Sequence, residues 1–93
     1  MAETGSPNLD CLPLEELEAF ATRHETTRSR AVAAALFPDR PRGMIRAASD
    51  LGHYARNRSV AMRLRLKGDV NGASVYESIC DRIHAGLPAF ARW

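Results

Sequence analysis

The chain has 93 residues, of which 45% are hydrophobic and 26% are charged, and its net charge is +2. This length allows a single domain with a modest core, and the composition is that of a folded protein, which excludes an intrinsically disordered chain. The longest uncharged apolar run covers residues 31–37, far less than the roughly 20 residues that span a bilayer, so no membrane segment is predicted. Residues 1–10 contain no basic stretch followed by an apolar one, which argues against a secretory signal and leads us to expect a cytoplasmic location.

The charges are distributed unevenly along the chain. Residues 1–26 hold six acidic residues and one basic residue, whereas residues 27–67 hold ten basic residues and two acidic ones. Twelve of the thirteen basic residues are arginines. Such asymmetry predicts either ion pairs between the segments or a basic binding surface.

The N-terminal residues 1–12 are predicted to form a loose arm, because glycine, serine, proline and asparagine cluster there. Residues 13–93 are predicted to form a single helical domain. Its first helix is expected to begin near Pro13, since proline is favoured in the first turn and the acidic residues that follow suit the positive end of the helix dipole.

The segment 13–36 has apolar residues at helical spacing at both ends but a polar middle, residues 22–30. One long helix with a polar centre and two helices broken near residues 26–27 are both compatible with this pattern. Pro38 ends the helical pattern in either case, and the two prolines and one glycine of residues 38–43 predict a loop.

A long helix is predicted over residues 44–67. Gly52 within it costs about 1 kcal/mol relative to alanine, so we expect it to mark close packing of a neighbouring element. Val60, Ala61 and Leu64 project from a second side, which means that this helix contacts two neighbours, or one neighbour and a partner chain. The main apolar side is formed by Met44, Ala48, Leu51, Ala55, Met62 and Leu66.

A last helix is predicted over residues 70–85, directly after the sequence Gly68-Asp69, because glycine ends helices and aspartate caps them. The very short connection makes the last two helices antiparallel neighbours. The tail beyond them carries Phe90 and Trp93, which are expected either to pack back on the core or to anchor a partner. The predicted fold is therefore all-α, a small antiparallel bundle of three or four helices with a C-terminal helix–turn–helix hairpin.

The string Ala61-x-x-Leu64-x-x-x-Gly68-Asp69-Val70-x-x-Ala73 is similar to the centre of a tetratricopeptide repeat. In that family, small residues let two helices approach closely and a glycine makes the tight turn between them. The resemblance covers residues 57–88, about one repeat, and no second copy precedes it. It implies a close helical hairpin, and for one copy it implies neither the family's peptide-binding groove nor membership of the family.

Catalytic and metal-binding motifs are not found in the sequence. No phosphate-binding loop or His-Glu-x-x-His motif is present, and the three histidines lie on separate segments. Asp50 and His53 stand one helical turn apart, but no third ligand or nucleophile accompanies them, so we predict no enzyme, no cofactor and no metal site. The two cysteines, Cys11 and Cys80, lie in different segments and are expected to be free thiols, with Cys80 buried on an apolar helical face.

Two functions follow from these patterns. The first is a small helical protein–protein interaction module, an adaptor, regulatory or self-assembling protein that could form a homodimer, with Val60, Leu64, Phe90 and Trp93 as the contact residues. This prediction loses its basis if both pairs are fully buried within one monomer. The alternative is a nucleic-acid-binding protein that uses the arginine-rich segment 27–67. Its candidate contact residues are Arg40, Arg42, Arg46, Arg56, Arg63 and Lys67.

Overall fold

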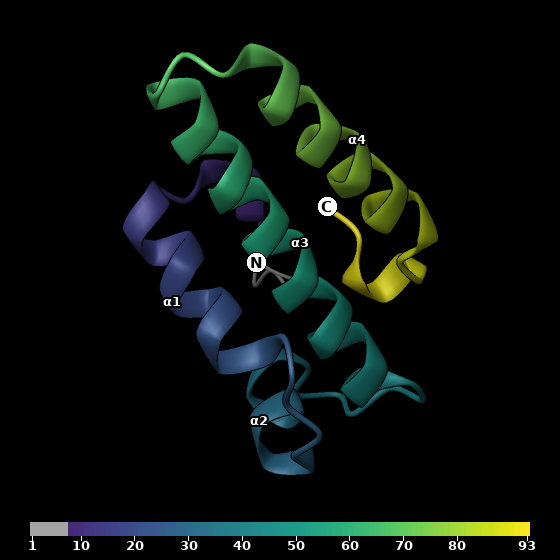
Figure 1. Cartoon of the computed structure of the whole chain (residues 1–93). Helices are drawn as coiled ribbons and strands as arrows, with labels where there is room; N and C mark the ends of the chain where they lie inside the picture. The colour runs from purple at the N-terminus through teal and green to yellow at the C-terminus, as the bar shows by residue number, and fades with distance from the viewer. Residues whose placement is uncertain (1–7) are drawn as a thin grey trace.

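The computed structural model describes residues 8–93, and these form an all-helical fold with no strand in the part described. The long helix α3 lies between α1 and α4, and each of these two runs antiparallel to it (Figure 1). The predicted bundle with a C-terminal hairpin is thus confirmed. The helices are α1 (Leu14–His24), α2 (Arg30–Leu36), α3 (Met44–Leu66) and α4 (Val70–Gly86), with the short 3-10 helices η1 (Leu9–Cys11) and η2 (Ala89–Ala91).

The segment 13–36 folds as two helices, which decides between the two alternatives that its sequence allows. α1 ends at His24, and α2 begins only at Arg30. Ser29 is the N-cap of α2, and its hydroxyl accepts a hydrogen bond from the backbone N–H of Val32 at 3.3 Å. The polar residues between the helices therefore form the connection and the N-cap of α2. Serine is favoured as an N-cap, because its hydroxyl accepts a hydrogen bond from an otherwise unpaired helix N–H.

The end of α1 approaches α3 closely at Gly52. A Cβ atom added there would lie 2.3 Å from the backbone nitrogen of Glu25 and 2.6 Å from its Cα. The prediction that Gly52 marks close packing of a neighbour is confirmed, since the end of α1 occupies the space that any side chain would need.

The hairpin between α3 and α4 turns at Gly68, whose φ of +87° suits glycine. The N–H of Asp69 donates to the carbonyl of Leu64 at 2.9 Å, and the N–H of Gly68 donates to that of Arg65 at 3.0 Å. This pair of bonds is the Schellman motif, which satisfies the last carbonyls of α3. Ala61 and Ala73 are both buried, as the predicted small-residue seam requires.

The described chain begins with residues that are packed on the core. Residues 1–7 of the predicted arm 1–12 lie outside the described residues, but Leu9 is fully buried and forms part of the core. The Asn8 side chain accepts a hydrogen bond from the N–H of Asp10 at 3.0 Å and so starts η1. A loose arm over residues 9–12 is therefore wrong, because a capped turn places the Leu9 side chain between the helices.

The last turn of α3 also departs from prediction. Met62 packs against the core, whereas Leu66, assigned to the same apolar side, is 79% exposed. The core thus ends about one helical turn before α3 does, and the end of α3 together with the start of α4 projects beyond it (Figure 1).

His24 provides a test of the packing between α1 and the rest of the bundle. Burial, and to a lesser degree the Arg23 charge, lowers the pKa of His24 below its usual 6.5. The unfolded chain then takes up a proton that the folded protein does not, so the free energy of unfolding should fall as the pH drops below about 6.5. We expect urea midpoints to decrease from about pH 7.5 to about pH 5.5.

The matched variant is His24→Phe, which keeps a ring against Phe20, whose centroid lies 4.3 Å from that of His24. Its urea midpoint should depend less on pH over the same interval. An equal pH dependence in the variant and the natural protein would show that His24 is not the titrating group.

Candidate nucleic-acid interface

Arginines in the second half of α3 are engaged in ion pairs within the protein. The Arg56 guanidinium lies 3.1 Å from Glu25, and Arg65 donates from Nη2 to Glu77 at 2.8 Å. Each pair joins α3 to another element: to α1 or the residue after it, to η1, or to α4. The four pairs are Arg56–Glu25, Arg58–Asp10, Arg63–Glu18 and Arg65–Glu77.

Two of these carboxylates, Glu18 and Glu77, are stabilised in their ionised form. The hydrogen bond from Arg63 lowers the pKa of Glu18, and the hydrogen bond from Arg65 does the same for Glu77. These arginines are therefore neutralised locally, and each exposed pair adds little to stability.

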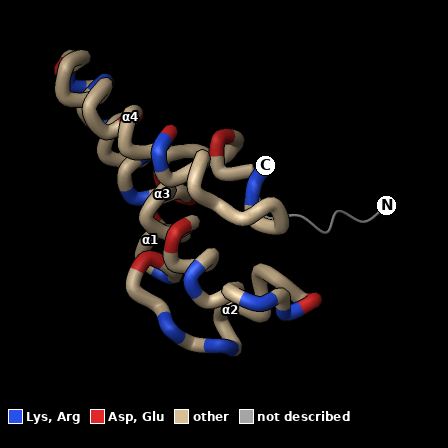
Figure 2. Tube along the Cα trace, turned by 90° about the vertical axis from the view of Figure 1, so that its right-hand side faces the viewer, with Lys and Arg blue, Asp and Glu red and all other residues tan. Residues whose placement is uncertain are grey.

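A second set of arginines lies around α2 and has few acidic neighbours. We call this set, Arg28, Arg30, Arg40, Arg42 and Arg46, the basic surface. Residues 26–46 contain these five arginines and one acidic residue, so their net charge is +4. Within residues 8–93, the only ion pair formed by any of the five joins Arg46 to Asp50 at 3.9 Å, and Asp39, which precedes Arg40 in the sequence, pairs with none of them. Figure 2 shows basic residues gathered along α2 and the chain that flanks it.

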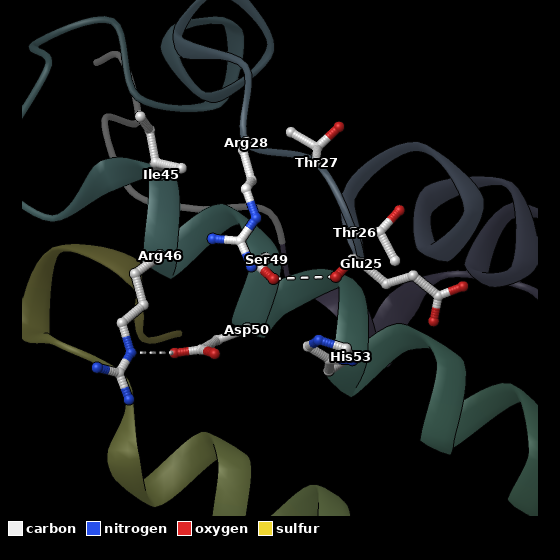
Figure 3. Close-up of a pocket in the computed structure, with 9 residues that line it drawn as sticks. All are labelled: Glu25, Thr26, Thr27, Arg28, Ile45, Arg46, Ser49, Asp50 and His53. Atoms are coloured by element: carbon white, nitrogen blue, oxygen red, sulfur yellow. Dashed lines mark hydrogen bonds and ion pairs between the residues drawn. The ribbon is translucent and has the colours of Figure 1, made fainter.

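A hollow of about 710 Å³ lies between the connection from α1 to α2 and the first turns of α3. The Arg28 side chain extends over Ser49, and Arg46 points to the opposite side beside Asp50 (Figure 3). The Ser49 hydroxyl donates to the Glu25 carbonyl at 2.9 Å, which fastens the connection to α3. The hollow is lined by Glu25, Thr26, Thr27, Arg28, Ile45, Arg46, Ser49, Asp50 and His53.

A second hollow, of about 420 Å³, adjoins the first, because Ile45 lines both. Arg30 reaches it from α2, while Arg40 and Arg42 reach it from the loop before α3. The five arginines thus form one continuous surface, although they come from four different segments. Guanidinium groups in this arrangement can donate paired hydrogen bonds to phosphate oxygens.

The N-terminus of α3 opens toward the same surface. Its N-cap is Gly43, at φ +84°, so no side chain caps the helix, and the first turn contains no acidic residue. The partial positive charge of the helix dipole is therefore not offset there and adds to the charge of the arginines.

The structure places the six predicted nucleic-acid-binding residues in separate parts of the molecule. It brings Arg40, Arg42 and Arg46 together. Arg56 and Arg63 face carboxylates of α1, and Lys67 lies at the hairpin turn, at the opposite end of the molecule (Figure 1).

Sequence reasoning missed Arg28 and Arg30 as members of this surface. A signal for them was present, since they flank the capping Ser29 and no acidic residue occurs between residues 26 and 38. A segment that contains two arginines, no acidic residue and the N-terminus of a helix indicates an open basic surface.

The predicted protein-contact residues are divided as well. Phe90 packs edge-on against Phe37 with ring centroids 5.1 Å apart, and Trp93 packs edge-on against Tyr54 at 4.8 Å. The tail therefore packs back on the core, although both residues remain half-buried. Val60 and Leu64 are also half-buried, so neither predicted pair is fully enclosed in the monomer.

Three side chains that were not among the predicted protein-contact residues are the most exposed large apolar side chains within residues 8–93. Leu66 is 79%, Val70 54% and Val75 59% exposed, and all three belong to the hairpin of α3 and α4. They lie near the turn, away from α2 (Figure 1).

The described residues offer little for catalysis. No group of three histidine, cysteine, aspartate or glutamate side chains within residues 8–93 is placed to hold a metal ion. Asp50 and His53 line the first hollow together, with no nucleophile beside them other than hydroxyl groups. None of the helices that the structure describes is long and apolar enough to cross a membrane.

Comparison with known proteins found no family model that matches the chain, and no curated protein or solved structure matches it either. The chemistry of the surface is therefore the basis for assigning a function.

Proposed function

We propose that this protein is a cytoplasmic, non-catalytic binding protein that holds the phosphate backbone of a nucleic acid on its basic surface. The observation that carries the proposal is the separation of its arginines into two groups. Those of the second half of α3 are neutralised by carboxylates, whereas Arg28, Arg30, Arg40 and Arg42 have no acidic partner within residues 8–93. A cytoplasmic location suits the two cysteines, which are not bridged.

Arginine is suited to this role because its planar guanidinium presents several N–H groups that match two phosphate oxygens at once. Five arginines contacting five phosphates would release about as many counterions. The logarithm of the binding constant should then fall with the logarithm of salt concentration with a slope of about −4.5 at most. The small net charge of +2 is no obstacle, since the charge is concentrated at one end.

Removing two arginines of the second hollow tests the proposal. In the double variant Arg30→Gln/Arg42→Gln we expect binding to random-sequence nucleic acid at low salt to weaken about tenfold or more, because two phosphate contacts are lost. The salt slope should also shrink by about 2. Fluorescence anisotropy over a series of salt concentrations measures both quantities.

Two further variants make this test specific. Arg82→Gln removes an exposed arginine of α4 and should leave binding unchanged. Asp50→Asn removes the carboxylate 3.9 Å from Arg46 and should strengthen binding, since Arg46 then has no competing partner. Lack of binding at low salt, or equal binding by the double variant and the natural protein, would contradict the proposal.

A second candidate function, self-association through the hairpin, is supported by the exposure of Leu66 and Val70. Lys67 and Asp69 are exposed beside them and carry opposite charges. In a two-fold symmetric contact, Lys67 of one copy would face Asp69 of the other while the apolar side chains meet between them. The occupant we propose for this surface is therefore a second copy of the chain.

Light scattering over a wide range of protein concentrations checks this candidate. We expect the mass of the natural protein to increase with concentration and the double variant Leu66→Ser/Val70→Ser to remain a monomer. Because both side chains lie outside the core, the variant should keep its fold, which circular dichroism verifies. A natural protein that stays monomeric throughout would exclude the homodimer.

A further inference from the structure

The phenylalanine, tyrosine and tryptophan rings of the chain stay outside the two hollows of the basic surface, although Phe37 and Phe90 line a smaller hollow that shares Pro41 with the second one. The sequence has six phenylalanine, tyrosine and tryptophan residues in all, and none of them lines either hollow. Phe37, the nearest in sequence, is only 3% exposed and packs against Phe90. Among the described residues, His53 carries the only aromatic ring that lines either hollow, and it is exposed at the first.

This placement matters because proteins that hold single strands generally stack the bases on aromatic rings. Each such contact is worth about five- to a hundredfold in affinity, and it offsets the entropy lost when a flexible strand is ordered. The basic surface offers charge for the phosphates but little for the bases. A single strand that binds here would lose conformational entropy, and few stacking contacts would offset that loss.

The polar groups of the surface are also of one kind. Residues 26–49 contain neither asparagine nor glutamine, the side chains that pair with adenine, and their donors are guanidinium groups and hydroxyls. The Ser29 and Ser49 hydroxyls are already used, as the cap of α2 and as the donor to Glu25. What is left at the surface is mainly guanidinium groups, which suit phosphate oxygens and, of the four bases, only guanine.

A duplex presents its phosphates on a stiff and regular surface, so it needs no ordering when it binds. We propose that the partner of the basic surface is a nucleic-acid duplex, held by its phosphates and without reading of its base sequence. This inference rests on the proposed function and narrows it. Double-stranded DNA and double-stranded RNA present the same phosphate groups, so either duplex could bind, and a direct comparison of the two distinguishes them.

The experiment compares one fluorescently labelled strand, alone and annealed to its complement, in DNA and in RNA, at the same low salt concentration. We expect the duplexes to bind about tenfold or more tightly than the single strands. Duplexes of different base composition should bind within about threefold of one another, since no base is read. A clear difference between DNA and RNA duplexes would identify which of them is the partner.

The variant His53→Ala sharpens the test, because it removes the only aromatic ring that lines the two hollows among residues 8–93. Its binding to duplex should match that of the natural protein. Preference for single strands, or weaker binding after His53→Ala, would overturn this inference and leave the proposed function intact. Failure of every nucleic acid to bind at low salt would overturn the proposed function itself, and this inference with it.

Discussion

Replacing Gly52 with alanine is expected to destabilise the protein by about 3 kcal/mol, the upper end of the range for an overpacked core. The reason is that the new methyl group would overlap the backbone nitrogen of Glu25, the residue directly after α1, and would lie 2.6 Å from its Cα. Backbone atoms cannot rotate away as the end of a side chain can, so α1 and α3 have to move apart. This contact lies in the interface between α1 and α3, where Arg56 also pairs with Glu25.

The thermal midpoint of the Gly52→Ala variant should fall by roughly 12–24 °C, since each kcal/mol shifts the midpoint of a domain of this size by about 4–8 °C. Gly86→Ala is the matched control. A Cβ there meets nothing within 4 Å, and Gly86 has no positive φ. It should therefore be neutral or stabilise by up to about 1 kcal/mol, because alanine favours the helix. Two glycine-to-alanine changes with the same effect would contradict the close contact.

Replacing Trp93 with alanine should cost about 2–3 kcal/mol of stability. The indole packs edge-on against Tyr54 and His84, with ring centroids 4.8 and 4.6 Å away. Its Nε1–H donates to the Asp10 carboxylate at 3.1 Å, and the Tyr54 hydroxyl donates to the other oxygen of the same carboxylate at 2.6 Å. The loss of the indole removes both the packing and one of the bonds that hold the arm.

The variant Trp93→Phe separates these two contributions. It keeps a ring between Tyr54 and His84 but loses the hydrogen bond to Asp10, so we expect a loss of about 1 kcal/mol. Urea unfolding followed by far-ultraviolet circular dichroism is the suitable measurement, because Trp93 is the only tryptophan and fluorescence would be lost with it. An alanine variant as stable as the natural protein would show that the tail does not hold the arm.

The charge of Asp10 explains why these contacts hold the arm together with the tail. Partial burial by itself raises the pKa of Asp10, but the hydrogen bonds from Tyr54 and Trp93, with the Arg58 charge, outweigh it and leave the pKa lowered. Burial and the bond to Asp10 raise the pKa of Tyr54, so its hydroxyl stays a donor. One ionised carboxylate thus joins η1, α3 and the residues after η2.

The helices and their ends were predictable because their signals are local. Apolar residues at helical spacing, Pro38 and the Gly68-Asp69 turn act through neighbours within a few residues, and so the element bounds agree with the sequence pattern to within about two residues. Gly52 was also readable, since glycine inside a helix is costly unless another chain segment needs the space.

Contacts between distant segments could not be read in this way. Leu9 was assigned to a loose arm because its neighbours are typical of loops, yet it is fully buried. Leu66 fits the apolar side of α3 by periodicity, but the helix extends past the elements that would cover it. Periodicity shows which side of a helix is apolar and does not show how far a neighbour reaches along it.

An all-α chain with a tight hairpin, a close contact at Gly52 and an excess of arginine in the middle follows from local patterns in the amino-acid order. Which arginines stay open to a partner depends on how the helices pack. Arg56 and Arg63 meet their carboxylates across 31 and 45 residues of chain, so their neutralisation depends on how α1 lies against α3. The arginines around α2 pair with no carboxylate in residues 8–93 beyond Asp50, because Glu18 lies along the other half of α3 and Glu25, at the first hollow, already pairs with Arg56.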